Sequence, residues 1–150
     1  MGIFDALDIS GSALSAERLR MDVTSENLAN AQTTRGANGQ PYQRKDVVLQ
    51  EVGGTGSSFG ATLAGVMGGG SSSTPGGVEV AGIVQDQSQG QLVYDPGHPD
   101  ANAQGYVRMP NVEPVTEMTD LITESRSYEA NVTAMQTAKS MYTKTLDLLR

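Results

Sequence analysis

The feature that most constrains this chain is a long apolar repeat in its last 36 residues, from 115 to 150. Alternating steps of three and four residues from Met118 meet apolar or aromatic side chains at eight of ten positions. Because such steps average about 3.5 residues, one stripe faces a partner helix along the whole length. No Gly or Pro interrupts the segment, and Pro114 suits a first helical position. We therefore predict one long helix that packs on another helix. The ten positions are Met118, Leu121, Ser125, Tyr128, Val132, Met135, Lys139, Tyr142, Leu146 and Leu149.

A second, weaker apolar row lies about a third of a turn away on the same helix. It consists of Ala134, Ala138, Met141 and Leu148. An ordinary helix bundle with a wide core face would explain both rows. The alternative is a helix that packs against its own chain and also against neighbouring subunits.

Residues 3 to about 30 form a second helical pattern, with apolar side chains on two opposed sides. A helix with two apolar sides has to be covered on both of them, which predicts two packing partners. One side carries Ile3, Leu7, Leu14, Met21 and Leu28, and the other carries Ile9, Ala16, Leu19 and Val23.

Between the two helical segments the sequence favours short strands. β-branched and aromatic residues concentrate in 42–52, 78–85, 92–94 and 106–109, with Gly and Pro in the turns between them. The stretch 53–77 has ten Gly, five Ser and no charged residue, which predicts a disordered loop. The predicted fold class is therefore mainly α with a small β-rich middle. We expect the long terminal helices to pack as an antiparallel, coiled-coil-like pair.

These patterns divide the chain into five segments. They are an N-terminal helix and turn (1–35), a strand region (36–52), the Gly/Ser-rich loop (53–77), a small β-rich region (78–113) and the C-terminal helix (114–150). We expect 1–35 and 114–150 to form one helical assembly domain.

Composition limits the kinds of protein that this chain can be. Only 37% of the residues are hydrophobic, Trp is absent and 18 residues are Gly, so a dense globular core is hard to build. The net charge of −7 and the lack of a basic patch argue against nucleic-acid binding. Cys is absent, which excludes disulfides and thiolate metal sites. We also expect neither a cleavable signal peptide nor a transmembrane span.

No constellation of residues for catalysis or for a cofactor emerges from the sequence. The single histidine, His98, lies between Gly97 and Pro99 and has no second His or Cys to share a metal with, so a surface turn is the better interpretation. The Gly-rich run 68–71 lacks the Gly-Lys-Ser/Thr that binds nucleotide phosphates. We expect no cofactor, no metal and no small-molecule substrate.

The segment that ends the first helix has a specific spacing, Ser25-x-Asn27-Leu28-Ala29-Asn30-x-x-Thr33-x-x-Gly36. So near the N-terminus, this spacing resembles the signature of the flagellar axial proteins, the family that builds the rod and the hook. Segments 38–42, 92–99, 105–112 and 125–131 are similar to the proximal-rod branch of that family. Together the resemblance covers the chain except for its Gly-rich middle.

The resemblance implies a structural subunit of the bacterial flagellar rod, the hollow drive shaft that crosses the periplasm and transmits torque to the hook. It implies partners too: copies of this chain, other rod proteins, and the flagellar type III apparatus that exports the chain. Two alternatives stay open, another rod or hook protein and a free-standing helical-bundle interaction module. An enzyme has no residue set to support it.

We expect the assembly interface to follow the apolar stripes of the two helices. Two polar candidates, Asn27 and Asn30, are either a helix-end device or, as the resemblance implies, part of the contact between subunits. Arg126 lies three residues from Glu129 and forms either a solvated pair or a rod contact. The expected apolar residues are Leu7, Leu14, Met21, Leu28, Leu121, Tyr128, Val132, Met135, Tyr142 and Leu146.

Overall fold

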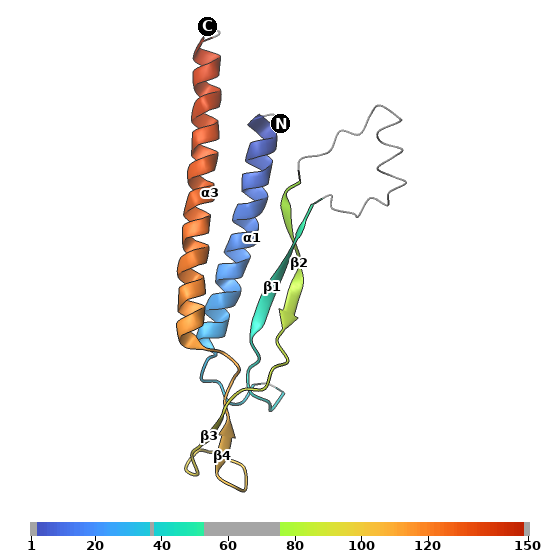
Figure 1. Ribbon diagram of the computed structural model, residues 1–150, viewed down its shortest axis with the longest axis vertical. Helices are drawn as coiled ribbons and strands as arrows, with labels where there is room; N and C mark the ends of the chain where they lie inside the picture. Colours follow the sequence, from blue (N-terminus) through green and yellow to red (C-terminus); the bar gives the residue numbers. More distant parts are fainter. Residues whose placement is uncertain (1–2, 37, 53–75, 149–150) are drawn as a thin grey trace, which may run out of the picture.

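The computed structural model describes residues 3–36, 38–52 and 76–148. Two long helices run side by side in opposite directions, and two small antiparallel sheets lie beside and below them (Figure 1). A helix-rich chain with a small β region was predicted, and this is confirmed. The disorder predicted for the Gly/Ser-rich loop concerns residues that lie almost entirely outside the described ones. The elements are α1 (Ile3–Ala29), β1 (Lys45–Glu51), β2 (Val78–Gln85), β3 (Leu92–Tyr94), β4 (Tyr106–Arg108) and α3 (Pro114–Leu148).

Local sequence signals set the helix ends. Helix α3 begins at Pro114, as predicted, and the Glu113 carboxylate accepts a hydrogen bond from the Thr116 hydroxyl at 3.2 Å. Helix α1 ends where the side-chain amide of Asn30 donates to the Glu26 carbonyl at 2.9 Å. The Thr33 hydroxyl then donates to the Asn30 side chain at 3.2 Å. Asn30 therefore acts as a helix-end device within the chain.

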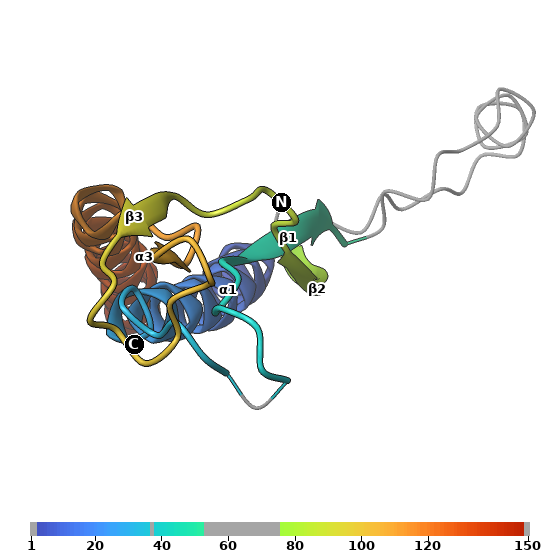
Figure 2. The same cartoon turned by 90° about the horizontal axis from the view of Figure 1, so that it is seen from below.

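Helix α1 lies between α3 and the ribbon formed by β1 and β2 (Figures 1 and 2). The ribbon is antiparallel, with Val47 opposite Ile83. Ser12 on α1 accepts a hydrogen bond from the Val78 amide at 3.1 Å, which fastens the start of β2 to the helix. The backbone approaches closely at Gly77, where a Cβ atom would lie 2.7 Å from the Ser12 hydroxyl oxygen. The two apolar sides of α1 are thus covered by two different elements.

Strands β3 and β4 form a hairpin at the far end of the molecule from the C-terminal end of α3 (Figure 1). The hairpin loop turns at Gly105, whose φ of 80° is costly for a residue with a side chain. His98 lies in the same loop, where its Nδ1 accepts a hydrogen bond from the Asp100 amide at 3.1 Å. The surface turn predicted for His98 is therefore confirmed.

The core is small and partly polar. Among the described residues, five hydrophobic side chains are buried, and none of them belongs to α3. The buried residues of α3 are instead two carboxylates, Glu117 and Glu124. No described helix combines the length and the apolarity that crossing a membrane requires. The five hydrophobic residues are Ala16, Val23, Val47, Val107 and Val112.

Candidate assembly interface

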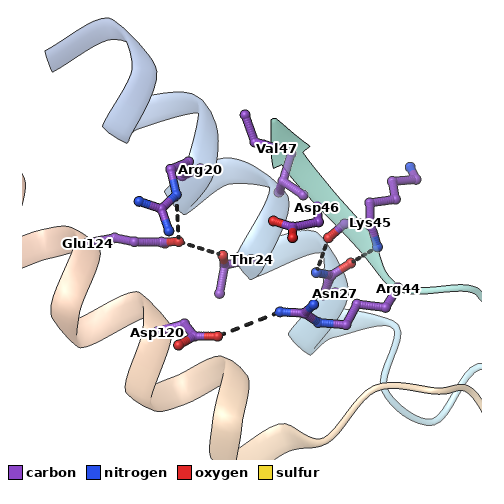
Figure 3. Close-up of a pocket in the computed structure, with 10 residues that line it drawn as sticks. Arg20, Thr24, Asn27, Arg44, Lys45, Asp46, Val47, Asp120 and Glu124 are labelled. Atoms are coloured by element: carbon purple, nitrogen blue, oxygen red, sulfur yellow. Dashed lines mark hydrogen bonds and ion pairs between the residues drawn. The ribbon is translucent and has the colours of Figure 1, made fainter. Parts of the chain in front are cut away.

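A buried polar cluster joins the two helices to the ribbon, and Asn27 is its centre. Asn27 is only 1% exposed and makes four hydrogen bonds, which reach β1, α3 and the loop before β1. Its amide nitrogen donates to the Lys45 carbonyl at 2.8 Å and to the Glu117 carboxylate at 3.1 Å. Its oxygen accepts from the Lys45 amide at 3.0 Å (Figure 3). The same oxygen accepts from the Tyr42 hydroxyl at 2.9 Å. We call Asn27, Tyr42, Arg44, Lys45 and Glu117 the polar joint.

The charge of Glu117 is balanced inside the polar joint. The Arg44 guanidinium donates to the Glu117 carboxylate at 2.5 Å and lies 3.6 Å from the Asp120 carboxylate. This hydrogen bond to Glu117 raises the pKa of Arg44. Burial, with smaller contributions from Glu26 and Glu117, raises the pKa of Tyr42 to about 12. Because a buried charge left without its partner costs roughly 3–5 kcal/mol, each member of the pair depends on the other.

Glu124 lies seven residues, or about two helical turns, beyond Glu117 and is also buried, at 4% exposure. One of its carboxylate oxygens, Oε1, accepts a hydrogen bond from Thr24 at 3.1 Å and lies 3.6 Å from the Arg20 guanidinium. The other, Oε2, has no hydrogen-bond partner. Burial therefore raises the pKa of Glu124, and the contacts with Thr24 and Arg20 oppose that shift only in part.

A cavity of about 30 Å³ lies between α1, α3 and the start of the ribbon and is lined by Glu124 and Val47 among others (Figure 3). Its wall includes the charged residues Arg20, Arg44, Asp46 and Asp120. A space of this size has room for a water molecule and little more. Within the described residues, no group of three or more His, Cys, Asp or Glu is placed to hold a metal. The arrangement is suited to fixing the register of the two helices.

The structure places the predicted interface residues in three environments. Asn27 is buried in the polar joint and Asn30 closes α1, so both have partners within the chain. Arg126 is exposed and makes no ion pair with Glu129 among the described contacts. Tyr142 and Leu146 are exposed, at 39% and 49%. The remaining eight, which are half-buried, are Leu7, Leu14, Met21, Leu28, Leu121, Tyr128, Val132 and Met135.

Contacts between the helices fix their register. Thr24 meets Glu124, and Asn27 meets Glu117. Further along, a Cβ atom at Gly11 would lie 3.9 Å from the Cε of Met135. Continuing this antiparallel register brings the start of α1 level with about residue 143 of α3, so Leu146 lies beyond the described part of α1 (Figure 1).

The outward side of α3 is strongly apolar at its lower end. Val115 is 71% exposed, and Met118 and Ile122 are each 54% exposed. At about 100° per residue these three side chains fall within an arc of roughly 60°, on the other side of the helix from Glu117 and Glu124. We call Val115, Met118 and Ile122 the outer α3 stripe. It faces away from the chain's own core.

Apolar periodicity does not predict the polar joint, because the positions of α3 buried deepest are Glu117 and Glu124. A signal was nevertheless present, since these two glutamates are seven residues apart and flank Leu121 on one face. Arg44, at the start of the ribbon, gave no local signal because its partner is 73 residues away.

Comparison with known proteins gives matches at both ends and along the whole chain. A family model described as flagella basal body rod protein matches residues 7–37. A second, flagellar basal body rod FlgEFG protein C-terminal, matches residues 103–148. The flagellar basal-body rod protein FlgC of Bacillus subtilis (strain 168) is 51% identical over 152 aligned residues, which cover 99% of each chain. The chain belongs to the FlgC family of flagellar basal-body rod proteins.

More distant members of the FlgC family match over the same length. The FlgC protein of Escherichia coli O6:H1 is 43% identical over 148 residues, covering 99% of this chain and 98% of that protein. The FlgC protein of Borreliella burgdorferi is 38% identical over 154 residues, covering 100% and 99%. The chain is thus a structural subunit of the flagellar basal-body rod and not an enzyme, and the predicted family is confirmed.

Proposed function

We propose that this rod subunit assembles helically with copies of itself and with other rod proteins into the hollow proximal rod. The rod would then transmit torque, let later subunits pass through its channel and cross the periplasm. The observation that carries the proposal is the incomplete burial of the apolar side chains of α3. This helix of 35 residues has a long apolar repeat, yet none of its described apolar side chains is fully buried in the single chain. Such a helix is stabilised fully only when neighbours cover it.

The half-buried stripes support a coiled-coil-like seam in the assembly. Leu14 and Met21 on α1, and Tyr128 and Val132 on α3, each retain exposed area that a neighbouring helix could cover. A stripe at 3.5-residue spacing keeps its direction over many turns, which suits a repeated helix-to-helix contact. On this proposal, segments 1–35 and 114–150 form the assembly domain.

The polar joint supports the same function in a different way. It ties α1, α3 and the ribbon together through buried hydrogen bonds, independently of the outward apolar surface. A subunit that passes torque has to keep its elements fixed relative to one another. The proposal also includes export by the flagellar type III apparatus, with the chain folding after export.

Leu146→Asp tests the proposal at a side chain that the single chain leaves 49% exposed. A carboxylate there costs the monomer little, but burying it unpaired at every subunit contact costs several kcal/mol. Cells that carry only this variant should export it but lack completed rods and motility. Thr143→Asp, three residues earlier and also exposed, is the matched control and should swim.

The deciding measurements are exported protein, completed basal bodies and swimming. Equal motility of the two variants would remove Leu146 from the interface. Intact rods and normal swimming in a strain with no copy of the gene would reject the rod function itself.

A further inference from the structure

The β3–β4 hairpin has one face that is exposed along its whole length. Its strands pair Leu92 with Arg108, Val93 with Val107, and Tyr94 with Tyr106. Since neighbouring residues of a strand point to opposite faces, Leu92, Tyr94, Tyr106 and Arg108 share one face. On the other face, Val107 is 2% exposed and its partner Val93 is 44% exposed. We call Leu92, Tyr94, Tyr106 and Arg108 the hairpin face.

The hairpin face has the composition of a binding surface. Tyr94 is 65% exposed, Leu92 59% and Tyr106 43%. Tyr and Arg are the residue types that most often dominate the energy of protein interfaces. Arg108 takes part in none of the ion pairs among the described residues, so its charge is free for a partner.

The hairpin face is also held in place before any partner binds. The rings of Tyr94 and Tyr106 meet edge to face, with centroids 5.2 Å apart. The strands continue their pairing on both sides, since the Asp95 amide donates to the Gly105 carbonyl at 2.9 Å and the Met109 amide donates to the Gln91 carbonyl at 2.8 Å. A surface that is already ordered loses less entropy on binding.

The outer α3 stripe is a second bare surface on the same chain, and its chemistry complements the hairpin face. Met118 and Ile122 offer apolar area to the two tyrosine rings. Glu129 is exposed and lies on the same side of α3, about 10 Å beyond Ile122 at 1.5 Å per residue. Its carboxylate can therefore pair with Arg108 when the tyrosines lie over the stripe. Arg126 is also near, which restricts Arg108 to the Glu129 side.

We propose that the hairpin face of one copy of this chain docks on the outer α3 stripe of a second copy. Tyr94 and Tyr106 cover Met118 and Ile122, and Arg108 pairs with Glu129. The two surfaces are different parts of the chain, so the contact is heterologous and can repeat from copy to copy without closing into a symmetric dimer. This inference rests on the proposed function, since it names the partner of the outward face of α3.

Cross-linking tests the contact directly, because the chain has no Cys of its own. Leu92→Cys and Ile122→Cys are placed together in one chain, which is expressed as the sole copy in the cell. Isolated basal bodies are then treated with a short bis-maleimide. We expect a ladder of dimers, trimers and larger species from the double variant and only monomers from either single variant. The control is the double variant Val84→Cys with Ile122→Cys, which combines the stripe position with an exposed residue of β2 outside the hairpin face. It should give no ladder.

The outcomes separate this inference from the proposed function. A double variant that builds rods and swims but yields only monomers would overturn the docking and leave the rod function intact. Dimers from a single variant, or cross-links to another rod protein alone, would overturn the choice of partner surface.

If the cysteine variants fail to assemble, exchanging the charges of Arg108 and Glu129 tests the same contact. Arg108→Glu should reduce swimming several-fold, and adding Glu129→Arg should restore it. Failure of Glu129→Arg to restore swimming would overturn the proposed pair.

Discussion

Asn27→Ala should destabilise the single chain more than any other truncation of a polar side chain. The change removes four hydrogen bonds from a side chain that is 1% exposed. A buried polar group left without a partner costs about 1–3 kcal/mol. Glu117 keeps Arg44 as a partner, whereas the Lys45 amide and carbonyl lose this one. We therefore expect a loss of about 3–5 kcal/mol in the free energy of unfolding.

Urea unfolding followed by far-UV circular dichroism measures this loss. Asn30→Ala is the matched control, because Asn30 has the same side chain and is more exposed, and its side chain bonds to Glu26 and Thr33 in the described part of the chain. It should cost no more than about 1 kcal/mol. Amide hydrogen exchange adds a local readout, since the Lys45 amide loses its acceptor in Asn27→Ala alone. Equal stability of the two variants would refute the view that the polar joint holds the chain together.

Three further predictions follow from particular residues. The raised pKa of Glu124 means that the folded chain binds this proton more tightly than the unfolded chain, so stability falls as pH rises from about 4.5 through the folded pKa. Glu124→Gln should flatten that dependence in urea unfolding without loss of stability at pH 7, and an unchanged profile would contradict it. Gly90→Ala should disrupt the hairpin attachment, because a Cβ atom there collides with the Met109 carbonyl, whereas Gly82→Ala meets nothing within 4 Å. Equal losses of Tm in Gly90→Ala and Gly82→Ala, measured by thermal unfolding, would contradict this. Met135 is half-buried beside α1 and Thr133 is exposed, so Met135→Asp should stop rod growth, whereas cells with Thr133→Asp should swim. Equal motility of the two strains would show that Met135 is not part of the contact between helices.

The elements were readable from the sequence because their signals are local. The 3-4 repeat and Pro114 predicted α3, and the described helix begins at Pro114. Strands β2 and β3 match the predicted ranges 78–85 and 92–94, since Gly and Pro bound the β-branched runs there. The two-sided pattern of α1 predicted two packing partners, and α3 and the ribbon are those partners.

The polar joint could not be predicted from such local signals. Which polar side chains become buried depends on contacts between residues far apart in the chain, such as the 90-residue separation of Asn27 and Glu117. Apolar periodicity treats Glu117 and Glu124 as solvent-facing, although they are the most buried positions on α3. Periodicity also gives a stripe without saying whether its own chain or a neighbour covers it. The exposure of Leu146 and of the outer α3 stripe supplied that information.

The central claim is that neighbouring subunits cover the apolar surface of α3. In a chain without natural Cys, Leu146→Cys gives one site whose reaction with a soluble maleimide reports its exposure. The site should react readily in the purified monomer and much more slowly in isolated basal bodies. Gln87→Cys, on an exposed segment away from α3, reports the reagent's access in both states. Equally fast labelling of Leu146→Cys in monomer and rod would contradict the claim.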